Sequence, residues 1–163
     1  MSIHLRPAKP DDLPFLKSIL YEAVFWRDVE NRPSYEEAFT DFPGVIKALA
    51  DWGERDGDTA IIATHNGTRV GSAWYRYWRA EDEMRGYTAN STPVIVIGVH
   101  AEFRGKKIGT RLLSGLIEQA KKEGVPQVSL MVSKDNYALK LYRQQGFKFH
   151  SETEDSITMV RDI

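Results

Sequence analysis

The sequence predicts a single α/β (α+β) domain, residues 1–163, in which helices flank a central mixed β-sheet. Three observations lead to this expectation. Strand-like and helix-like segments alternate along the chain, the run 94–99 is apolar at nearly every position, and residues 108–120 have the periodicity of an amphipathic helix. Such an apolar run is typical of a strand buried on both faces inside a sheet. Helices that alternate with strands cover a sheet of this kind.

The first part of the chain predicts one strand and three helical segments. Residues 3–8 form the strand, and a helix runs on from about Asp12. Ser34 and Glu37 have the spacing of a capping box, which predicts the start of a second helix. The pair Pro43-Gly44 is expected to interrupt that helix before a further turn or two.

The remaining elements are marked by turn and helix-end signals. Asn66-Gly67 supplies a two-residue turn between two strands rich in β-branched and aromatic residues, which predicts a hairpin. Gly124 ends the amphipathic helix. The last segments are a strand at 127–133, a short helix within 136–146 and a closing hairpin from 147 to 163.

Composition limits the class of protein. With 42% hydrophobic and 28% charged residues the chain is ordinary for a globular protein, and no stretch reaches the roughly 18 apolar residues of a membrane span. The start of the chain lacks the apolar core of a signal peptide, so we expect a cytoplasmic protein with no membrane partner. The chain has no cysteine, which excludes disulfides, thiolate catalysis and thiolate metal sites.

Charge is unevenly distributed and predicts a local anion site. Residues 1–93 have 11 basic and 15 acidic side chains, whereas residues 94–163 have 11 and 8. A nucleic-acid-binding face would need a basic domain, so we expect no nucleic-acid partner. Four cations gather near the start of the helix that follows the apolar strand: Arg104, Lys106, Lys107 and Arg111. Positive charge is unfavourable there because the helix dipole is positive at its N-terminus.

A bound anion would explain these cations. The first backbone N–H groups of a helix have no partner within the helix, and Gly105 and Gly109 allow a ligand to approach the main chain. A phosphate would satisfy the free donors and accept contacts from the basic side chains. The alternative is that the cations form a solvated face and the glycines only shape a loop.

Other chemistries have less support. The P-loop pattern and the dinucleotide fingerprint are both absent. The four histidines are scattered without metal-ligand spacing, so we expect no metal. No G-x-S-x-G motif is present, which leaves a serine hydrolase without its nucleophile elbow.

Two segments of the sequence resemble those of a known family. The segment "VHAEFRGKKIGTRLL", a second strand and then "NYALKLYRQQGF" are similar to the GNAT superfamily of acetyl-CoA-dependent N-acetyltransferases. The family's phosphate loop reads [RQ]-x-x-G-x-[GA], and its second signature is an Asn followed six residues later by a Tyr, then Gly-Phe. The matching residues are Arg104, Gly109, Asn136, Tyr142, Gly146 and Phe147. Lys107 stands where the family usually has its first Gly.

The resemblance implies the GNAT-like acyl-CoA N-acyltransferase fold and acetyl-CoA as co-substrate. The strands 94–99 and 128–133 would splay apart, with the pantetheine arm between them, paired with main-chain groups near Ile97 and Val99. A backbone N–H of the first strand would stabilise the oxyanion. The phosphates would be held by the loop residues Arg104, Gly105, Lys106, Lys107, Gly109 and Thr110.

Two further residues take roles by resemblance. Asn136 would contact the cofactor, although it could equally cap the following helix, or do both. Tyr142 would protonate or hydrogen-bond the departing thiolate. Proton transfer from a phenol to such a thiolate is uphill by about 1.5 pKa units, roughly 2 kcal/mol, so hydrogen bonding is the main role unless the pKa of Tyr142 is lowered. A core aromatic is the alternative reading of this residue.

The general base and the amine remain open. Candidate bases are His100, Glu102, Glu22, Glu81, Asp82 and Glu83. Aromatic and acidic residues of the N-terminal region and of the loop before residue 94 suit a cationic amine: Trp26, Trp52, Tyr35, Tyr87, Asp28 and Glu30. The class of amine stays open among small amines, amino acids, antibiotics and protein N-termini. A non-catalytic acyl-CoA-binding or regulatory module is the rival interpretation. Members of the family are often dimers, so a homodimer is a possible assembly.

Overall fold

The computed structural model describes residues 2–163, and these divide into two compact units. The first unit runs to Trp74 and includes Val96–Leu113. The second comprises Tyr75–Ile95 and Ser114–Ile163. Two strands and one helix therefore pass from one unit into the other.

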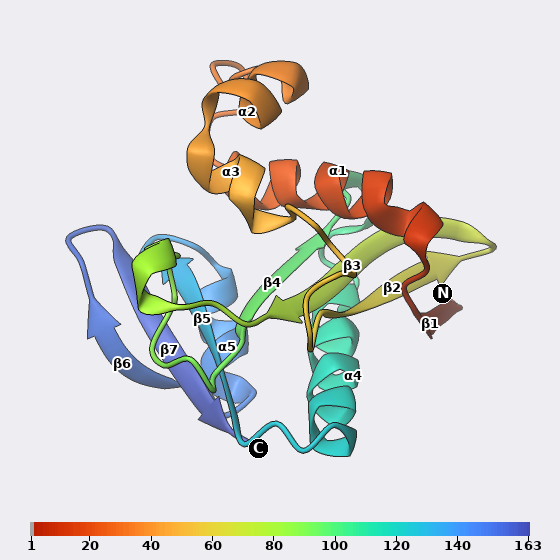
Figure 1. Cartoon of the computed structure of the whole chain (residues 1–163). Coiled ribbons are helices and arrows are strands. Elements are labelled where there is room, and N and C mark those ends of the chain that lie inside the picture. The colour runs from red at the N-terminus through yellow and green to blue at the C-terminus, as the bar shows by residue number, and fades with distance from the viewer. Residues whose placement is uncertain (1) are drawn as a thin grey trace. The chain divides into compact units, whose positions relative to one another are not determined.

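The chain forms a mixed β-sheet with helices, as the sequence predicts (Figure 1). The strands are β1 (Ile3–Pro7), β2 (Thr59–His65), β3 (Thr68–Arg76), β4 (Val94–Val99), β5 (Gln127–Ser133), β6 (Lys148–Glu152) and β7 (Ser156–Asp162). The helices are α1 (Leu13–Val24), α2 (Tyr35–Asp41), α3 (Pro43–Ala48), α4 (Ile108–Lys122) and α5 (Ala138–Gln144). Hydrogen bonds order the strands β1-β2-β3-β4-β5-β7-β6. The β4–β5 pair is parallel, and the pairs β1–β2, β5–β7 and β6–β7 are antiparallel.

In the first unit, helices α1, α2 and α3 lie on the same side of the strands β1–β3, with α2 farthest from them (Figure 1). The apolar face of α1, which includes Leu16, Ile19 and Leu20, is buried. Asp12 precedes the helix and is buried, and its carboxylate pairs with Arg6 of β1 at 2.7 Å and with Arg69 of β3 at 3.1 Å. This cluster ties the start of α1 to two strands.

The short helices α2 and α3 agree with the sequence prediction. Ser34 Oγ accepts a hydrogen bond from Glu37 N at 3.1 Å, which confirms the predicted N-cap of α2. The predicted interruption is present and falls at Phe42, since α2 ends at Asp41 and α3 begins at Pro43. Proline is well suited to the first turn of a helix, where its missing N–H is not needed.

Two glycines let the sheet of the first unit contact helices closely on both faces. A Cβ at Gly98 of β4 would lie 2.8 Å from Ile19 Cγ2 of α1. A Cβ at Gly71 of β3 would lie 3.0 Å from Leu112 Cδ1 of α4. The hairpin turn between β2 and β3 has positive φ at Asn66 and Gly67, 51° and 81°, as the sequence predicts.

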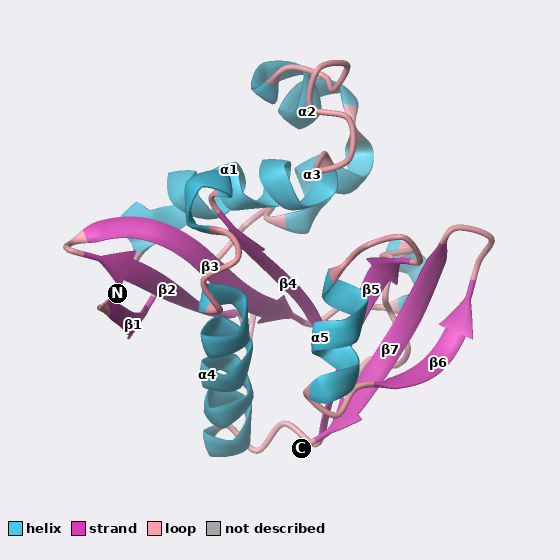
Figure 2. Cartoon of the chain, turned by 180° about the vertical axis from the view of Figure 1, so that it is seen from behind, coloured by secondary structure: helices cyan, strands magenta, loops and turns pink. Residues whose placement is uncertain are grey.

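The second unit is built on the antiparallel strands β5, β7 and β6, with α5 in contact with β5 (Figure 2). The β5–β7 ladder runs from Gln127 opposite Asp162 to Ser133 opposite Ser156. The loop before β4 is tied to β5, because the buried Ser129 Oγ donates to Gly86 O at 2.7 Å. Strands β6 and β7 pair antiparallel, which confirms the predicted closing hairpin.

Strand β4 differs from the expectation that it is buried on both faces. Val94 and Ile95 are buried, whereas residues 96–99 are half-buried. The pairing described between β4 and β5 is a single residue pair, Val94 opposite Ser129. A strand that has a neighbour over only part of its length keeps some of its surface exposed, although every residue in it is apolar or glycine.

Candidate active site

In the first unit, the end of β4 leads into a loop held by two hydrogen bonds. His100 N donates to Val70 O of β3 at 2.8 Å. Arg104 Nε donates to Val99 O at 3.2 Å, across a short 3₁₀ turn over Ala101–Phe103 that the sequence analysis missed. The half-buried Ile97 and Val99, predicted to pair with the pantetheine arm, therefore stand directly before a loop of fixed shape.

The loop takes the left-handed conformation at two positions before α4 begins. Gly105 has φ 77° and Lys107 has φ 63°. Glycine adopts such angles freely, whereas a residue with a Cβ does so at a cost of about 1–2 kcal/mol. Lys107 stands where the resembling family has glycine, so the structure gives a backbone reason for that preference. Gly109 and Thr110 follow within the first turn of α4.

Basic side chains surround this loop, and three of them lack acidic partners. Arg104 Nη2 lies 4.0 Å from Glu22 Oε2 of α1. Lys106 Nζ lies 5.7 Å from the ring centroid of Phe103. Within residues 2–163, no carboxylate forms an ion pair with Lys106, Lys107 or Arg111, all of which are exposed. These three charges are available to an anion.

In the second unit, Asn136 caps helix α5. Its Oδ1 accepts a hydrogen bond from Ala138 N at 2.9 Å. The capping role that the sequence analysis weighed is therefore confirmed for the side-chain oxygen. The Nδ2 group has no hydrogen-bond partner among the described residues, so the amide hydrogens remain for a ligand.

Tyr142 lies on α5 with its ring in the core of the second unit. Its ring packs edge-on against Phe147 with centroids 6.0 Å apart, and the residue is 8% exposed. Burial raises the pKa of Tyr142 well above its ordinary value, and the nearby Tyr137 phenol adds to the effect. Easy proton donation by Tyr142 would need a lowered pKa, and burial has the opposite effect. The hydroxyl group has no hydrogen-bond partner within residues 2–163.

The candidate bases are held in different ways, and none stands out. Glu22 accepts hydrogen bonds from Arg32 at 3.0 and 3.4 Å, which makes it a counterion. His100 packs edge-on against the Phe15 ring, with centroids 5.3 Å apart. Glu81 lies 3.9 Å from Arg79 on the surface. Glu102 and Glu83 are exposed, and Asp82 accepts from Arg79 N at 2.8 Å. No base is assigned.

The aromatic residues proposed for amine recognition do not form one site. Tyr35 packs with Tyr21 and Phe39 in a cluster of rings on α1 and α2. Trp52 packs with Trp74, at 6.5 Å between centroids. Tyr87, in the second unit, donates to Asn90 Oδ1 at 2.5 Å. Trp26 lies beneath the Arg27 guanidinium. The acids Asp28 and Glu30 are exposed in the loop after α1.

The predicted residues thus fall into two groups. Ile97, Val99 and the loop residues 104–110 gather in the first unit, and Asn136 and Tyr142 lie in the second. Among residues 2–163, no three His, Asp or Glu side chains are arranged to hold a metal ion. None of the helices in that range has the length and apolar character needed to span a membrane. Sequence reasoning missed the Glu22 contact with Arg104, which no local pattern signals.

The sequence of this chain is similar to those of known proteins. The model of the acetyltransferase (GNAT) family matches residues 22–147. An acetyltransferase of Pectobacterium atrosepticum is 34% identical over 109 residues, which cover 66% of this chain and 67% of that protein. The L-amino acid N-acyltransferase of Escherichia coli is 30% identical over 135 residues, covering 80% of this chain and 67% of that protein.

Solved structures show the same fold. The phosphinothricin acetyltransferase of Sinorhizobium meliloti, determined in complex with AcCoA, matches with a TM-score of 0.71 at 23% identity. The match covers 100% of this chain and 89% of that one. The expected GNAT-like fold is confirmed.

Proposed function

Because the chain belongs to the acetyltransferase (GNAT) family, we propose that it transfers the acetyl group of acetyl-CoA to a primary amine by direct attack. The observation that carries the proposal is the loop 104–107. It follows β4, has two residues in the left-handed conformation and presents two cations without acidic partners, Lys106 and Lys107, ahead of a 15-residue helix. Such a loop fits a pyrophosphate, since backbone donors and side-chain charges gather there.

In this proposal the first unit binds the co-substrate. The side chains of Arg104, Lys106 and Lys107 neutralise the phosphates, and the backbone N–H groups near Gly109 and Thr110, at the start of α4, donate to phosphate oxygens. Binding of an anion would compete with Glu22 for Arg104. The main-chain groups of Ile97 and Val99 pair with the pantetheine arm.

The proposed reaction forms one bond and breaks one bond. The amine nitrogen attacks the thioester carbonyl carbon, a C–N bond forms, and the C–S bond breaks to release the thiolate of coenzyme A. The attacking nitrogen loses its proton to water or to an unassigned base. Tyr142 donates a hydrogen bond to the departing sulfur. Its raised pKa favours this role over complete proton transfer.

The test is thiol release from acetyl-CoA by the wild type and by Tyr142→Phe. The acceptor panel contains amino acids, which the printed name of the Escherichia coli relative suggests, with polyamines, aminoglycosides and short peptides. We expect Tyr142→Phe to lower kcat by about 10²-fold while coenzyme A affinity is unchanged. The control is Tyr137→Phe, at a residue 74% exposed on the same segment, and this variant is expected to keep full activity.

Two outcomes would contradict the proposal. Equal turnover in Tyr142→Phe and wild type would remove Tyr142 from the reaction. Tight coenzyme A binding without turnover across the whole panel would favour the non-catalytic module.

A further inference from the structure

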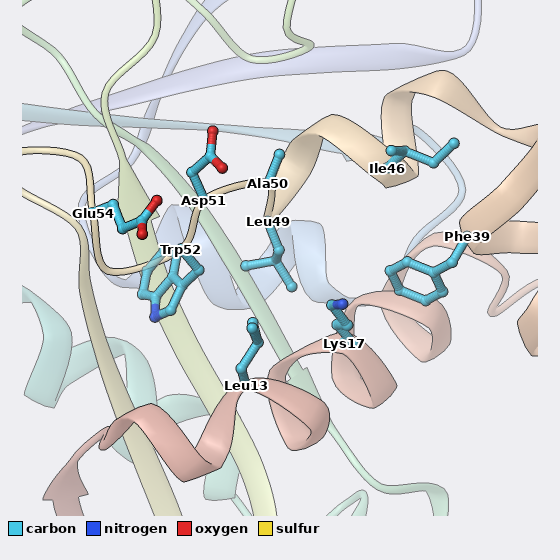
Figure 3. A pocket seen from close by; sticks show the side chains of 9 residues that line it. All are labelled: Leu13, Lys17, Phe39, Ile46, Leu49, Ala50, Asp51, Trp52 and Glu54. Atoms are coloured by element: carbon cyan, nitrogen blue, oxygen red, sulfur yellow. The ribbon is translucent and has the colours of Figure 1, made fainter.

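A pocket of about 540 Å³ lies in the first unit between α1, α3 and the turn that follows α3. In Figure 3, Lys17 and Phe39 lie at one end of this pocket, Trp52 and Glu54 lie at the other, and Leu49 lies between them. The pocket is therefore apolar in its middle and charged at its ends. The proposed reaction gives this pocket no role.

The acidic end is built on a fixed turn. Leu49 O accepts from Trp52 N at 3.2 Å, Asp51 O accepts from Glu54 N at 3.0 Å, and Gly53 N donates to Asp58 Oδ2 at 2.9 Å. Asp51 has φ 56°, a left-handed conformation that is unfavourable for any residue with a Cβ atom. Within residues 2–163, the carboxylates of Asp51 and Glu54 form no hydrogen bond or ion pair, so both acidic charges at the pocket are unneutralised.

The basic end has a single charge. Lys17 of α1 lines the pocket, and its Nζ lies 5.8 Å from the centroid of the Phe39 ring. No carboxylate of the described chain pairs with it. The charges of the pocket are thus separated, one positive at one end and two negative at the other, with Leu13 and Leu49 contributing apolar wall between them.

The pocket is distinct from the phosphate-binding loop. Leu13 and Lys17 face the pocket, whereas Glu22 of the same helix contacts Arg104 of the loop. An α-helix turns by about 100° per residue, so Leu13 and Glu22 point about 180° apart. A ligand in the pocket therefore sits on the other side of α1 from the loop.

We propose that this pocket binds a small zwitterion whose ammonium and carboxylate are separated by an apolar spacer, of the kind represented by the ω-amino acid 6-aminohexanoate. Its ammonium group contacts Asp51 and Glu54, its carboxylate contacts Lys17, and its apolar part packs on Leu49 and the neighbouring rings. A cation with no carboxylate leaves Lys17 unpaired, and an anion with no ammonium meets two negative charges, so the pocket discriminates against both.

The test is calorimetric titration of the full chain, without acetyl-CoA, with 6-aminohexanoate, hexylamine and hexanoate. We expect 6-aminohexanoate to bind most tightly. Lys17→Met keeps the apolar stem and is expected to weaken binding of 6-aminohexanoate about tenfold, the value of one charge-assisted contact, while leaving hexylamine binding unchanged. Asp51→Asn combined with Glu54→Gln weakens both amines. The control, Lys47→Met, removes a charge of α3 that does not line the pocket.

Absence of saturable heat with 6-aminohexanoate would overturn the proposal. Equal affinity for all three compounds, or an effect of Lys47→Met equal to that of Lys17→Met, would overturn it as well. Tyr142→Phe and Lys106→Met are expected to leave this binding unchanged. If they abolish it, the titrated site is the acetyl-transfer site and not the pocket. The result is therefore independent of whether the proposed acetyl transfer is correct.

Discussion

At Lys107 the backbone conformation and the residue type are in conflict. The φ of 63° favours glycine, so we expect Lys107→Gly to be more stable than Lys107→Ala by about 1 kcal/mol. Both substitutions remove the charge, which isolates the backbone effect. The measurement is the free energy of unfolding by urea denaturation.

Lys106 supplies the matched control for this comparison. It lies next in the chain, is exposed, and does not have positive φ. There the order is expected to reverse, with Ala at least as stable as Gly, because Gly loses more conformational freedom on folding. The same order at both positions would show that the left-handed conformation at Lys107 does not matter for stability.

Asp12 is expected to make stability depend on pH. Hydrogen bonds from Arg6, from Lys9 N and from Arg69 hold the pKa of this buried carboxyl well below its usual range. A lowered folded-state pKa gives stability that is present above the ordinary value near 4 and is lost as pH falls toward the folded-state pKa. We expect Asp12→Asn to cost about 2 kcal/mol at pH 7.

The difference between wild type and Asp12→Asn should shrink as pH is lowered below about 4. Asp11→Asn is the control, since Asp11 is exposed and adjacent. Urea denaturation over a range of pH measures both variants. A constant difference down to pH 2 would mean that the carboxylate charge contributes nothing and that shape alone accounts for the loss.

At the scale of elements, the contact between α1 and β4 leaves no space. Gly98→Ala places a methyl group 2.8 Å from Ile19 Cγ2 and is expected to destabilise the fold by about 2 kcal/mol. Ile19→Ala alone costs about 3 kcal/mol because Ile19 is fully buried. In the double variant the new methyl group fills part of the cavity, so the total should be at least about 1 kcal/mol below the sum.

Gly44→Ala is the control for this cycle, because a Cβ there has nothing within 4 Å and the residue lies in α3. It should be neutral or slightly stabilising, as alanine is the better helix former. Strict additivity of Gly98→Ala and Ile19→Ala in chemical denaturation would contradict the close contact.

The elements that sequence predicted best are those with local causes. Asn66-Gly67 fixes its hairpin turn through its own conformational preference, and the buried face of α4, which includes Leu112 and Leu116, follows from helical period alone. The error at β4 has a non-local cause. Exposure of β4 beyond Ile95 depends on its neighbours in space, which its own residues do not specify.

For the whole molecule, the uneven charge predicts a salt effect. The chain has a formal net charge of −1, yet the loop 104–107 and Arg111 gather positive charge. Screening at higher ionic strength should raise KM for acetyl-CoA by about threefold between 0.05 and 0.5 M salt. Arg111→Met should reduce this dependence, and Lys122→Met, at the other end of α4, should not. Steady-state kinetics at several salt concentrations decides the matter.

The fold class and half of the candidate site were accessible from sequence. Charge and glycine placement alone indicate an anion site at residues 104–109, whereas Asn136 and Tyr142 emerge only through resemblance to a family. Tertiary contacts account for the rest. Neither the pairing of Arg104 with Glu22 nor the left-handed Asp51 beside the pocket leaves a periodic signal in the chain.

The burial of Tyr142 gives the protein an optical reporter of its own unfolding. The chain has seven tyrosines, and burial holds the pKa of Tyr142 above the value near 10 of an unfolded chain. In alkaline solution its phenolate absorbance therefore develops together with the loss of structure, after that of an exposed tyrosine such as Tyr137. Subtracting the ultraviolet trace of Tyr142→Phe from that of the wild type would follow the core of the second unit without any added label.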